Sequence, residues 1–331
     1  MREWIMDFRS LAMYRIMDLV ERAASSSAPV IITGESGTGK ELVAQIIHKL
    51  SPRSAGPYVP LNCAAIPETL IESELFGHER GAFTGADHSR DGCFKRASGG
   101  TLHLDEFIEM RPDMQAKLLR VLEEHKVRPL GGSREVAVDV RVLAATNRPL
   151  KHAIREGLLR EDLFYRLSVF VLELPPLRER IEDLPMLVAQ FIQEANREQR
   201  RQVEGVSAEC LEAFKAHRWP GNVRELRNVV DHAVIVSKRR TISLDDLPPQ
   251  LRAPNDQIQY VTVPVGSSLD DVERELIGRT IDLAAGNKTR AAQMLGLGVR
   301  TLYRRLERYA GSKIPGGRIG ASIARRNGSR V

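Results

Sequence analysis

Hydrophobic positions follow two different periods along the first half of the chain. A β-branched run at Val30–Thr33 is followed by apolar residues at helical spacing between Leu42 and Leu50. Four further apolar runs of strand length alternate with helical stretches such as residues 114–124, and they occupy residues 58–61, 101–104, 140–144 and 169–174. Strands that alternate with helices predict a three-layer α/β domain with a mainly parallel sheet.

The pattern changes after Pro175 and Pro176, where the strand-like runs stop. Helical patterns follow at residues 184–198, Ala208–Ala216 and 223–236, which predicts a separate, all-helical unit. Prolines and polar residues with little periodicity then indicate a linker, before a last helical segment at residues 269–309 and a glycine-rich, basic tail that we expect to be disordered. The expected domains are residues 1–174, 175–251 and 269–310, with the linker at 252–268 and the tail at 311–331.

The composition predicts where the protein is found in the cell and shows that the C-terminal end of the chain is basic. No apolar stretch approaches the roughly 20 residues of a membrane span, and no signal sequence is visible, so we expect a soluble, cytoplasmic protein without a membrane partner. The three cysteines match no metal-ligand spacing and are interpreted as reduced, structural thiols. The net charge is +6, but residues 286–331 hold eleven Lys or Arg against one acid, Glu307. This asymmetry favours a polyanion-binding module over a merely solvated basic tail.

A phosphate site is predicted between the first strand and the first helix. The spacing G-x-x-x-x-G-K is typical of a P-loop, in which backbone N–H groups and a lysine surround phosphates. The residues concerned are Gly34, Glu35, Ser36, Gly37, Thr38, Gly39 and Lys40. Glu41 stands where a Ser or Thr hydroxyl normally touches Mg²⁺, so the metal must depend on other ligands. A glycine-rich turn before a helix is the alternative, and the flanking strand and helix argue against it.

Further candidates for ATP hydrolysis follow the later strands. Asp105 and Glu106 end an apolar strand, where we expect Asp105 to hold Mg²⁺ and Glu106 to polarise the attacking water. Asn147 ends the next strand and can sense the γ-phosphate. Arg160 and Arg166 are either surface ion-pair partners or guanidinium groups for the γ-phosphate of a neighbouring subunit.

A glycine-rich segment isolates one aromatic side chain, Phe83, between Gly81 and Gly85. A mobile loop that presents a single apolar side chain suits contact with a partner protein. A glycine-rich turn that buries the phenylalanine is the other interpretation that the residues allow.

Taken together, these motifs resemble those of the sigma-54-dependent transcription activators, the bacterial enhancer-binding proteins. GAFTGA stands at residues 81–86, beside GESGTGKE at 34–41, ESELFGHE at 72–79 and LPPLRER at 174–180. The resemblance implies an AAA+ P-loop domain with a helical lid. It also implies that Glu41 is normal here, and that His103 and Leu159 replace phenylalanines usual in the family.

The resemblance also assigns roles to residues. It implies contact with sigma-54 by the loop residues Gly81, Ala82, Phe83, Thr84, Gly85 and Ala86. It implies that Asn62 couples Glu106 to this loop as a nucleotide switch, that Arg160 and Arg166 act on a neighbouring subunit, and that Arg224 senses the nucleotide. ATP and Mg²⁺ are the implied cofactors, and a ring of identical subunits, a hexamer, is the implied assembly.

The C-terminal segment has the pattern of a helix-turn-helix. Asn287 can cap a short helix, Gly296 and Gly298 can make a turn, and the next helix is rich in arginine. A surface amphipathic helix is the alternative interpretation. The segment resembles the Fis-type domain, and the candidate contacts to double-stranded DNA are Lys288, Arg300, Thr301, Tyr303, Arg304 and Arg305.

The favoured function is a sigma-54-dependent activator that hydrolyses ATP to convert the closed complex of sigma-54 RNA polymerase into an open one. A general AAA+ protein-remodelling ATPase is the first alternative, and intact GAFTGA argues against it. A DNA-binding regulator with a degenerate ATPase site is the second, and it is opposed by the intact Lys40, Asp105, Glu106 and Arg160. The P-loop begins about thirty residues from Met1, which leads us to expect no N-terminal regulatory domain and control in trans or by abundance, although a truncated gene would look the same.

Overall fold

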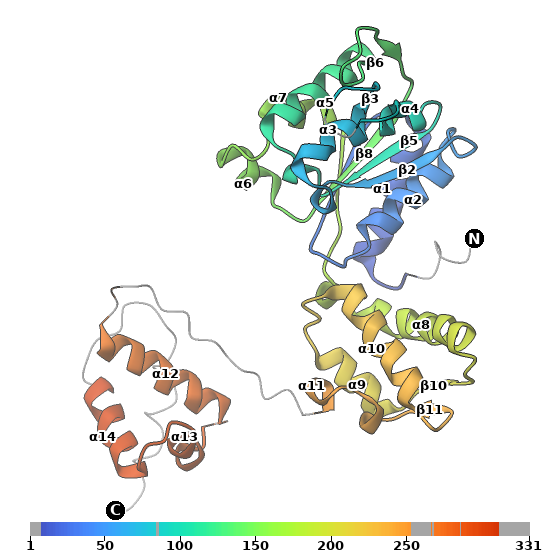
Figure 1. Cartoon of the computed structure of the whole chain (residues 1–331). Coiled ribbons are helices and arrows are strands. Elements are labelled where there is room, and N and C mark those ends of the chain that lie inside the picture. Colours follow the sequence, from blue (N-terminus) through green and yellow to red (C-terminus); the bar gives the residue numbers. More distant parts are fainter. Residues whose placement is uncertain (1–7, 84–85, 253–265, 267, 285, 311–331) are drawn as a thin grey trace, which may run out of the picture. The chain divides into compact units, whose positions relative to one another are not determined.

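The computed structural model describes residues 8–83, 86–252, 266, 268–284 and 286–310. The chain divides into two compact units, Met1–Asn255 and Asp256–Val331 (Figure 1). The expected disordered tail, and all but three residues of the expected linker, lie outside the described residues. Within the described part of the chain, no helix is long and apolar enough to cross a membrane.

The centre of the first unit is a five-stranded sheet in the order β2-β5-β8-β1-β9. All four strand pairs are parallel, which confirms the predicted α/β fold. The strands are β1 (Val30–Thr33), β2 (Tyr58–Asn62), β5 (Thr101–Asp105), β8 (Arg141–Thr146) and β9 (Phe170–Glu173). Parallel strands place their carboxyl ends at one edge of the sheet, so the loops after β1, β2, β5 and β8 meet there.

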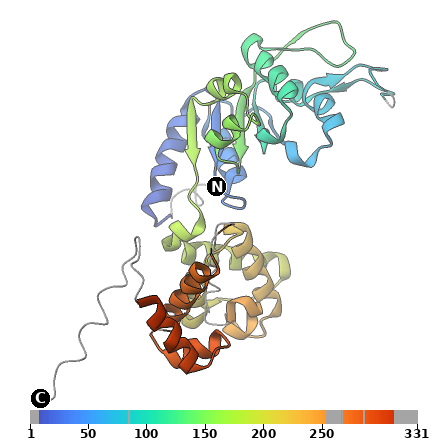
Figure 2. The same cartoon turned by 90° about the vertical axis from the view of Figure 1, so that its left-hand side faces the viewer.

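Helices cover both faces of the sheet because side chains alternate along each strand (Figures 1 and 2). Val30 and Ile32 of β1 pack in one apolar cluster with α1 and α2, whereas Ile31 packs in the cluster on the opposite face with α3, α4, α5 and α7. The helices are α1 (Leu11–Ser25), α2 (Lys40–Leu50), α3 (Glu68–Phe76), α4 (Cys93–Arg96), α5 (Pro112–Glu124), α6 (Leu150–Arg155) and α7 (Glu161–Leu167), with short 3₁₀ turns η2 (Cys63–Ala65) and η3 (Phe107–Glu109). The core is therefore two apolar layers with the sheet between them.

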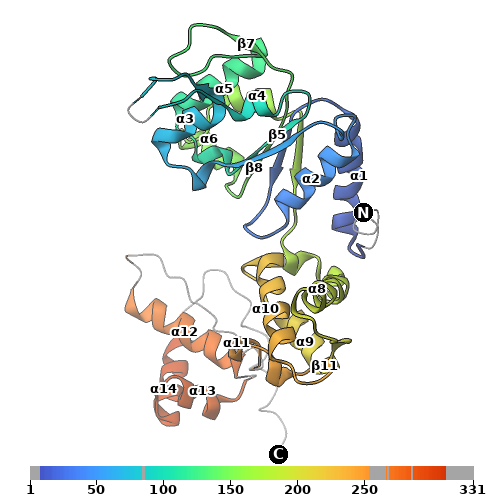
Figure 3. The ribbon, with the colours of Figure 1, turned by 45° about the vertical axis from the view of Figure 1, so that its right-hand side comes forward.

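Two small antiparallel hairpins project from the α/β layer (Figures 2 and 3). One pairs β3 (Gly77–His78) with β4 (Arg90–Asp91), and the other pairs β6 (Lys126–Val127) with β7 (Val136–Ala137). His78 also forms a bridge with Leu130, so the first hairpin is joined to the loop that connects β6 and β7. The described residues of the GAFTGA segment, 81–83 and 86, lie between β3 and β4.

The remainder of the first unit is mainly helical, as predicted. Its principal helices α8, α9 and α10 enclose a core that includes Phe191, Phe214 and Trp219. The elements are η4 (Leu177–Glu179), η5 (Ile181–Asp183), α8 (Leu184–Gln199), β10 (Gly205–Val206), α9 (Ala208–Ala216), α10 (Asn222–Val236), β11 (Thr241–Ile242), η6 (Leu244–Asp246) and α11 (Pro249–Arg252). The parallel β10–β11 pair corrects the prediction of an all-helical unit, because strands of two residues are too short to show alternation.

The second unit is a three-helix domain of α12 (Leu269–Leu283), α13 (Lys288–Met294) and α14 (Val299–Ala310) (Figure 3). Its core contains Ile277, Ala291, Ala292 and Leu302, and the two alanines allow close approach of the helices. The Asn287 side chain accepts hydrogen bonds from the N–H groups of Thr289 and Arg290, which confirms the predicted cap. The short turn between α13 and α14 gives helix-turn-helix connectivity.

Candidate functional site

The P-loop connects β1 to α2 at the carboxyl edge of the sheet. The Lys40 side chain is 7% exposed and turns back onto the loop, where its Nζ donates to the carbonyl oxygens of Gly34 at 2.9 Å and Glu35 at 3.4 Å. Gly37 has a φ of +79°, and a Cβ atom there would lie 2.3 Å from the carbonyl oxygen of Gly221. Only glycine fits this position, so the loop can pack closely against the lid while its backbone remains available to phosphate oxygens.

The two acids at the end of β5 lie beside this lysine. Glu106 Oε1 is 3.6 Å from Lys40 Nζ, and Glu106 Oε2 accepts a hydrogen bond of 3.0 Å from the backbone N–H of Asn147. Asn62 Nδ2 donates to Asp105 Oδ2 at 3.3 Å. The structure thus brings together five of the predicted site residues, from four strand ends.

Glu106 adopts a strained backbone conformation. Its φ of +51° lies in the left-handed region, which costs a residue with a side chain about 1 kcal/mol or more. The conformation aims the carboxylate at Lys40 and the end of β8, away from the strand direction. Strain held in place by the surrounding structure is typical of catalytic groups.

Asn62 has a second role besides its contact with Asp105. Its Oδ1 accepts hydrogen bonds from the N–H groups of Ala64 and Ala65, so it caps η2, the turn that leads into α3. In this structure its amide donates to Asp105 and not to Glu106, the residue that the resemblance pairs with it.

Glu41 lies exposed in the first turn of α2, where Gln45 donates to its carboxylate. The Asp105 carboxylate therefore remains the candidate Mg²⁺ ligand, because carboxylate oxygens are the side-chain ligands that Mg²⁺ prefers.

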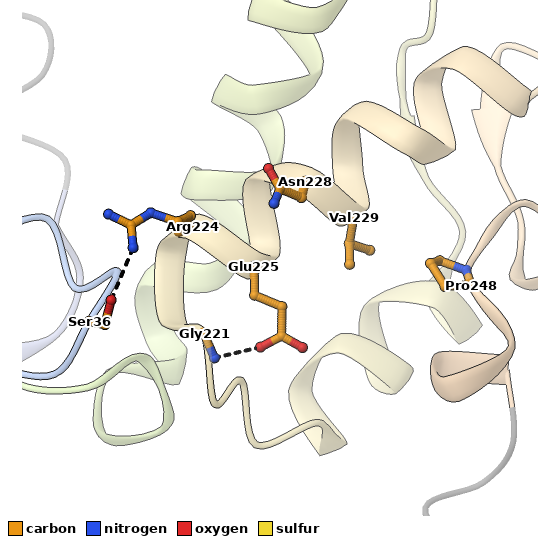
Figure 4. Close-up of a pocket in the computed structure, with 7 residues that line it drawn as sticks. All are labelled: Ser36, Gly221, Arg224, Glu225, Asn228, Val229 and Pro248. Carbon is orange, nitrogen blue, oxygen red and sulfur yellow. Dashed lines mark hydrogen bonds between the residues drawn. The ribbon is translucent and has the colours of Figure 1, made fainter. Parts of the chain in front are cut away.

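Arg224 reaches the P-loop from the first turn of α10. Its Nη1 donates to Ser36 Oγ at 3.0 Å, as Figure 4 shows. A pocket of about 370 Å³ lies beside this contact, lined by Ser36, Gly221, Arg224, Glu225, Asn228, Val229 and Pro248 (Figure 4). Arg224 thus lies where the lid meets the P-loop.

Three further residues of the lid contact the P-loop, and the sequence motifs did not predict these contacts. Arg178 donates to both carboxylate oxygens of Glu35, and Asn222 donates to one of them. These two contacts lower the pKa of Glu35 to about 2. Arg180 is buried and donates to the carbonyl oxygen of Thr38 at 2.7 Å. Arg178 and Arg180 lie in the LPPLRER motif and Asn222 lies beside Arg224, but the motifs alone do not name a partner.

The predicted arginine pair lies on and beside α7. Arg160 is exposed and forms an ion pair with Asp162, and Arg166 is exposed and donates to the carbonyl oxygen of Leu122. Both therefore contact their own chain at the surface in this structure. Displacing the Arg160 guanidinium from Asp162 costs little, because exposed ion pairs contribute about 1 kcal/mol or less.

The described part of the GAFTGA loop presents Phe83 at its end. Phe83 is 38% exposed, and its ring contacts His78 edge-on with 5.0 Å between ring centroids. The loop closes on itself through a hydrogen bond from the Gly81 N–H to the Ala86 carbonyl oxygen. Phe83 is thus not buried. Thr84 and Gly85, two of the predicted contacts, lie outside the described residues.

The candidate DNA contacts in the second unit differ in how they are held. Arg300 and Arg304 are exposed on α14, and Thr301 is half-buried near the helix start. Lys288 lies over the ring of Tyr303, with its Nζ 4.8 Å from the centroid. Arg305 forms an ion pair with Glu273 of α12, and Arg308 does so with Asp270. The last two arginines therefore already have partners within the domain.

The three cysteines are free and buried, as predicted. Burial raises the pKa of the Cys63 thiol to about 12 and that of Cys210 to about 11. His103 is also buried, and Tyr58 Oη lies 2.9 Å from its Nδ1, while its Nε2 has no partner among the described residues. Burial lowers the pKa of His103 to about 4, so it is a neutral core residue.

A parallel sheet with a P-loop, an acidic strand end and a helical lid that contacts the P-loop defines an AAA+ ATPase domain. Comparison with known proteins agrees with this class. The model of the sigma-54 interaction domain matches residues 6–173, that of an AAA+ ATPase lid domain matches 178–262, and that of the Fis family of bacterial regulatory proteins matches 268–309.

Individual relatives give the same result. The regulatory protein AtoC of Escherichia coli is 47% identical over 306 residues, which cover 91% of this chain and 66% of AtoC. The transcriptional regulatory protein FlbD of Caulobacter vibrioides is 43% identical over 332 residues, which cover 95% of this chain and 73% of FlbD. A crystal structure of NtrX from Brucella abortus in complex with ATP has a TM-score of 0.66 and 35% identity, and the match covers 91% of this chain and 68% of NtrX. The chain spans about two thirds of the length of these relatives.

The chain belongs to the sigma-54-dependent transcription activators, with an AAA+ ATPase domain, its lid and a Fis-type helix-turn-helix.

Proposed function

We propose that this protein hydrolyses ATP in a ring of identical subunits and uses the reaction to convert the closed complex of sigma-54 RNA polymerase into an open complex. We assign residues 1–174 to the α/β part of the ATPase, 175–251 to its lid and 269–310 to DNA binding. The last of these holds the protein on double-stranded DNA upstream of the promoter, which raises its local concentration at the polymerase. Its place of action is then the bacterial cytoplasm, where the polymerase is found.

Residues around the P-loop have separate roles in hydrolysis. The P-loop N–H groups and Lys40 bind the phosphates, and Asp105 holds Mg²⁺. Glu106 orients the attacking water and accepts a proton from it. Mg²⁺, when bound, neutralises charge on the β- and γ-phosphates. Asn147 and Arg224 contact the γ-phosphate from the strand end and the lid. Arg160 and Arg166 act on the nucleotide of the neighbouring subunit, since both are exposed on this chain.

The proposal rests on a short connection between Asp105, at the end of β5, and the GAFTGA segment. The connection consists of one hydrogen bond and a short length of chain. Asn62 contacts Asp105 and caps η2, and η2 is followed directly by α3, β3 and the segment at residues 81–86. A change at the β5 end on hydrolysis therefore reaches the loop through one turn and one helix. Phe83 stands exposed at the end of this route and is the side chain we assign to sigma-54 contact.

The test is transcription from a supercoiled sigma-54 promoter with purified polymerase, Mg²⁺ and ATP. We expect the intact chain to form open complexes, and Phe83→Ala to keep ATP hydrolysis while losing them. Tyr14→Ala is the matched control, because Tyr14 is an exposed aromatic residue of α1, at 70% exposure, away from the loop. Hydrolysis by the intact chain without open complexes on a panel of sigma-54 promoters would favour a general remodelling ATPase.

A further inference from the structure

The lid binds the P-loop through the carbonyl oxygens of three consecutive residues. Asn222 Nδ2 donates to the Ser36 oxygen at 3.0 Å, the backbone N–H of Val223 donates to the Gly37 oxygen at 3.0 Å, and Arg180 Nη2 donates to the Thr38 oxygen at 2.7 Å. All three donors belong to the lid, from the two segments that flank α8 and α9. The lid therefore determines the direction of the carbonyl groups on this side of the loop.

Peptide geometry makes this direction important for phosphate binding. In a planar trans peptide, the carbonyl of one residue points opposite to the N–H of the next. When the oxygens of Ser36 and Thr38 point at the lid, the N–H groups of Gly37 and Gly39 point away from it, toward the inside of the loop. The N–H of Thr38, on the middle peptide, bends toward the Glu35 oxygen at 3.3 Å. The anion-binding N–H groups are thus oriented by bonds on the opposite side of the same peptides.

The side chains that make these bonds are buried in the lid. Asn222 is fully buried with a φ of +52°, and its Oδ1 accepts a hydrogen bond of 2.8 Å from the N–H of Leu177. Arg180 is 3% exposed. Such groups are costly to bury, so their placement against loop carbonyls indicates a specific role.

We infer that Asn222 and Arg180 are positioning residues of the phosphate site, which orient the P-loop N–H groups from the lid side. The inference rests on the proposed function, because it takes the P-loop as the site of ATP. It makes the phosphate site a joint product of both parts of the ATPase. Displacement of the lid disorganises the N–H groups and lowers nucleotide affinity, and bound phosphate in turn holds the lid against the loop, since such coupling is reciprocal.

Asn222→Asp in the full chain removes this lid donor. It keeps the shape, the left-handed conformation and the acceptor for Leu177, but it replaces the donor to the Ser36 carbonyl oxygen and to the Glu35 carboxylate with an acceptor. We expect ATP affinity, measured calorimetrically with Mg²⁺, to fall about tenfold or more, because the hydrogen bonds to Ser36 and Glu35 are lost and their acceptors are left without this donor. Amide hydrogen exchange in the peptide that contains residues 34–40 should become faster in the protein without nucleotide.

Asn196→Asp is the matched control for a structural effect. The Asn196 amide donates to the carbonyl oxygen of Val203 at 2.7 Å within the lid, so the same chemical change removes a comparable bond away from the P-loop. We expect a lower melting temperature with unchanged ATP affinity and unchanged exchange at residues 34–40. Equal ATP affinity and equal exchange in Asn222→Asp and the intact chain would overturn the inference.

Arg180 provides a second, independent pair of variants. Arg180→Lys keeps a donor that can reach the Thr38 oxygen, and Arg180→Met does not, so we expect the lysine variant to bind ATP at least several-fold more tightly. Equal affinity of these two variants also counts against the inference, and it remains informative if Asn222→Asp does not fold. An intact chain that binds no ATP would instead overturn the proposed function, so the two failures are distinguishable.

Discussion

Arg141 is a buried arginine that stabilises the α/β part of the ATPase by contacting backbone carbonyls. Its guanidinium donates to the oxygens of Ala23, Ala24 and Ala28, at and beyond the end of α1, at distances of 2.6 to 3.3 Å. A cation is favourable at a helix C-terminus, where the last carbonyl groups lack partners within the helix. Burial lowers the pKa of Arg141 to about 10, which still leaves it charged at neutral pH.

Replacing Arg141 with Met should therefore destabilise the fold strongly. The change keeps most of the side-chain volume but removes the guanidinium hydrogen bonds to three carbonyl oxygens, and we expect the free energy of unfolding to fall by about 3 kcal/mol. Urea unfolding followed by circular dichroism measures the effect. Arg15→Met, at an exposed position of α1, is the control and should change stability by no more than about 0.5 kcal/mol. Similar values for the two variants would show that the carbonyl contacts are energetically minor.

At the scale of elements, the two hairpins of the α/β layer support each other. The Glu79 N–H donates to the Leu130 oxygen, and the Leu130 N–H donates to the Gly77 oxygen, each at 2.9 Å. Gly131 has a φ of +71°, and a Cβ atom there would lie 2.9 Å from the Cβ of Ala82 in the GAFTGA segment. The second hairpin thus limits the positions that the first can take.

Gly131→Ala should disturb the loop while leaving the nucleotide site intact. The alanine backbone must keep the left-handed conformation at a cost of about 1 kcal/mol, and its methyl group must displace Ala82, so we expect reduced open-complex formation with ATP hydrolysis retained. Promoter opening and phosphate release, measured in parallel, check this. Gly205→Ala is the control, because its φ is not positive and nothing lies within 4 Å of an added Cβ. Loss of hydrolysis in Gly131→Ala would contradict the expected separation.

The helix-turn-helix allows a comparison between arginines on one helix. Arg304 is exposed, whereas Arg308 is paired with Asp270 across the domain at 2.9 Å. We expect Arg304→Ala to weaken binding to duplex DNA and to reduce the slope of log affinity against log salt by about one, as for a lost phosphate contact. Arg308→Ala should change both quantities less. Fluorescence anisotropy over a salt series measures them, and equal effects of the two changes would refute the distinction.

The sheet and the nucleotide residues could be predicted because they leave periodic or motif-like patterns. The strand at Val30–Thr33 is one such pattern, and Lys40 and Glu106 lie at fixed positions relative to strand ends. Arg180 and Asn222 could not be assigned a role, since their partners are backbone carbonyls that any residue supplies. The strained φ of Glu106 was equally invisible, because it depends on packing between strands that are distant in sequence.

At the scale of the whole molecule, a single chain does not bring every proposed catalytic group to one nucleotide-binding site. Lys40, Asp105 and Glu106 lie together at the strand ends, whereas Arg160 and Arg166 contact Asp162 and the Leu122 oxygen of their own chain. A head-to-tail interface in a closed ring can bring the arginines of one subunit to the P-loop of the next. Such an arrangement makes hydrolysis a property of subunit pairs.

Mixing two inactive variants tests this arrangement directly. Lys40→Met removes the phosphate contact but keeps the arginines, and Arg160→Ala removes an arginine but keeps the P-loop, so each variant alone should hydrolyse ATP at least about 10³-fold more slowly. In a mixed ring, interfaces that join the intact P-loop of one variant to the intact arginine of the other regain every group. At equal concentrations and random mixing, about a quarter of all head-to-tail interfaces have this composition. We therefore expect ATPase activity to recover toward a quarter of that of the intact chain. If the mixture remains as inactive as its components while both still assemble, Arg160 does not act on a neighbouring subunit.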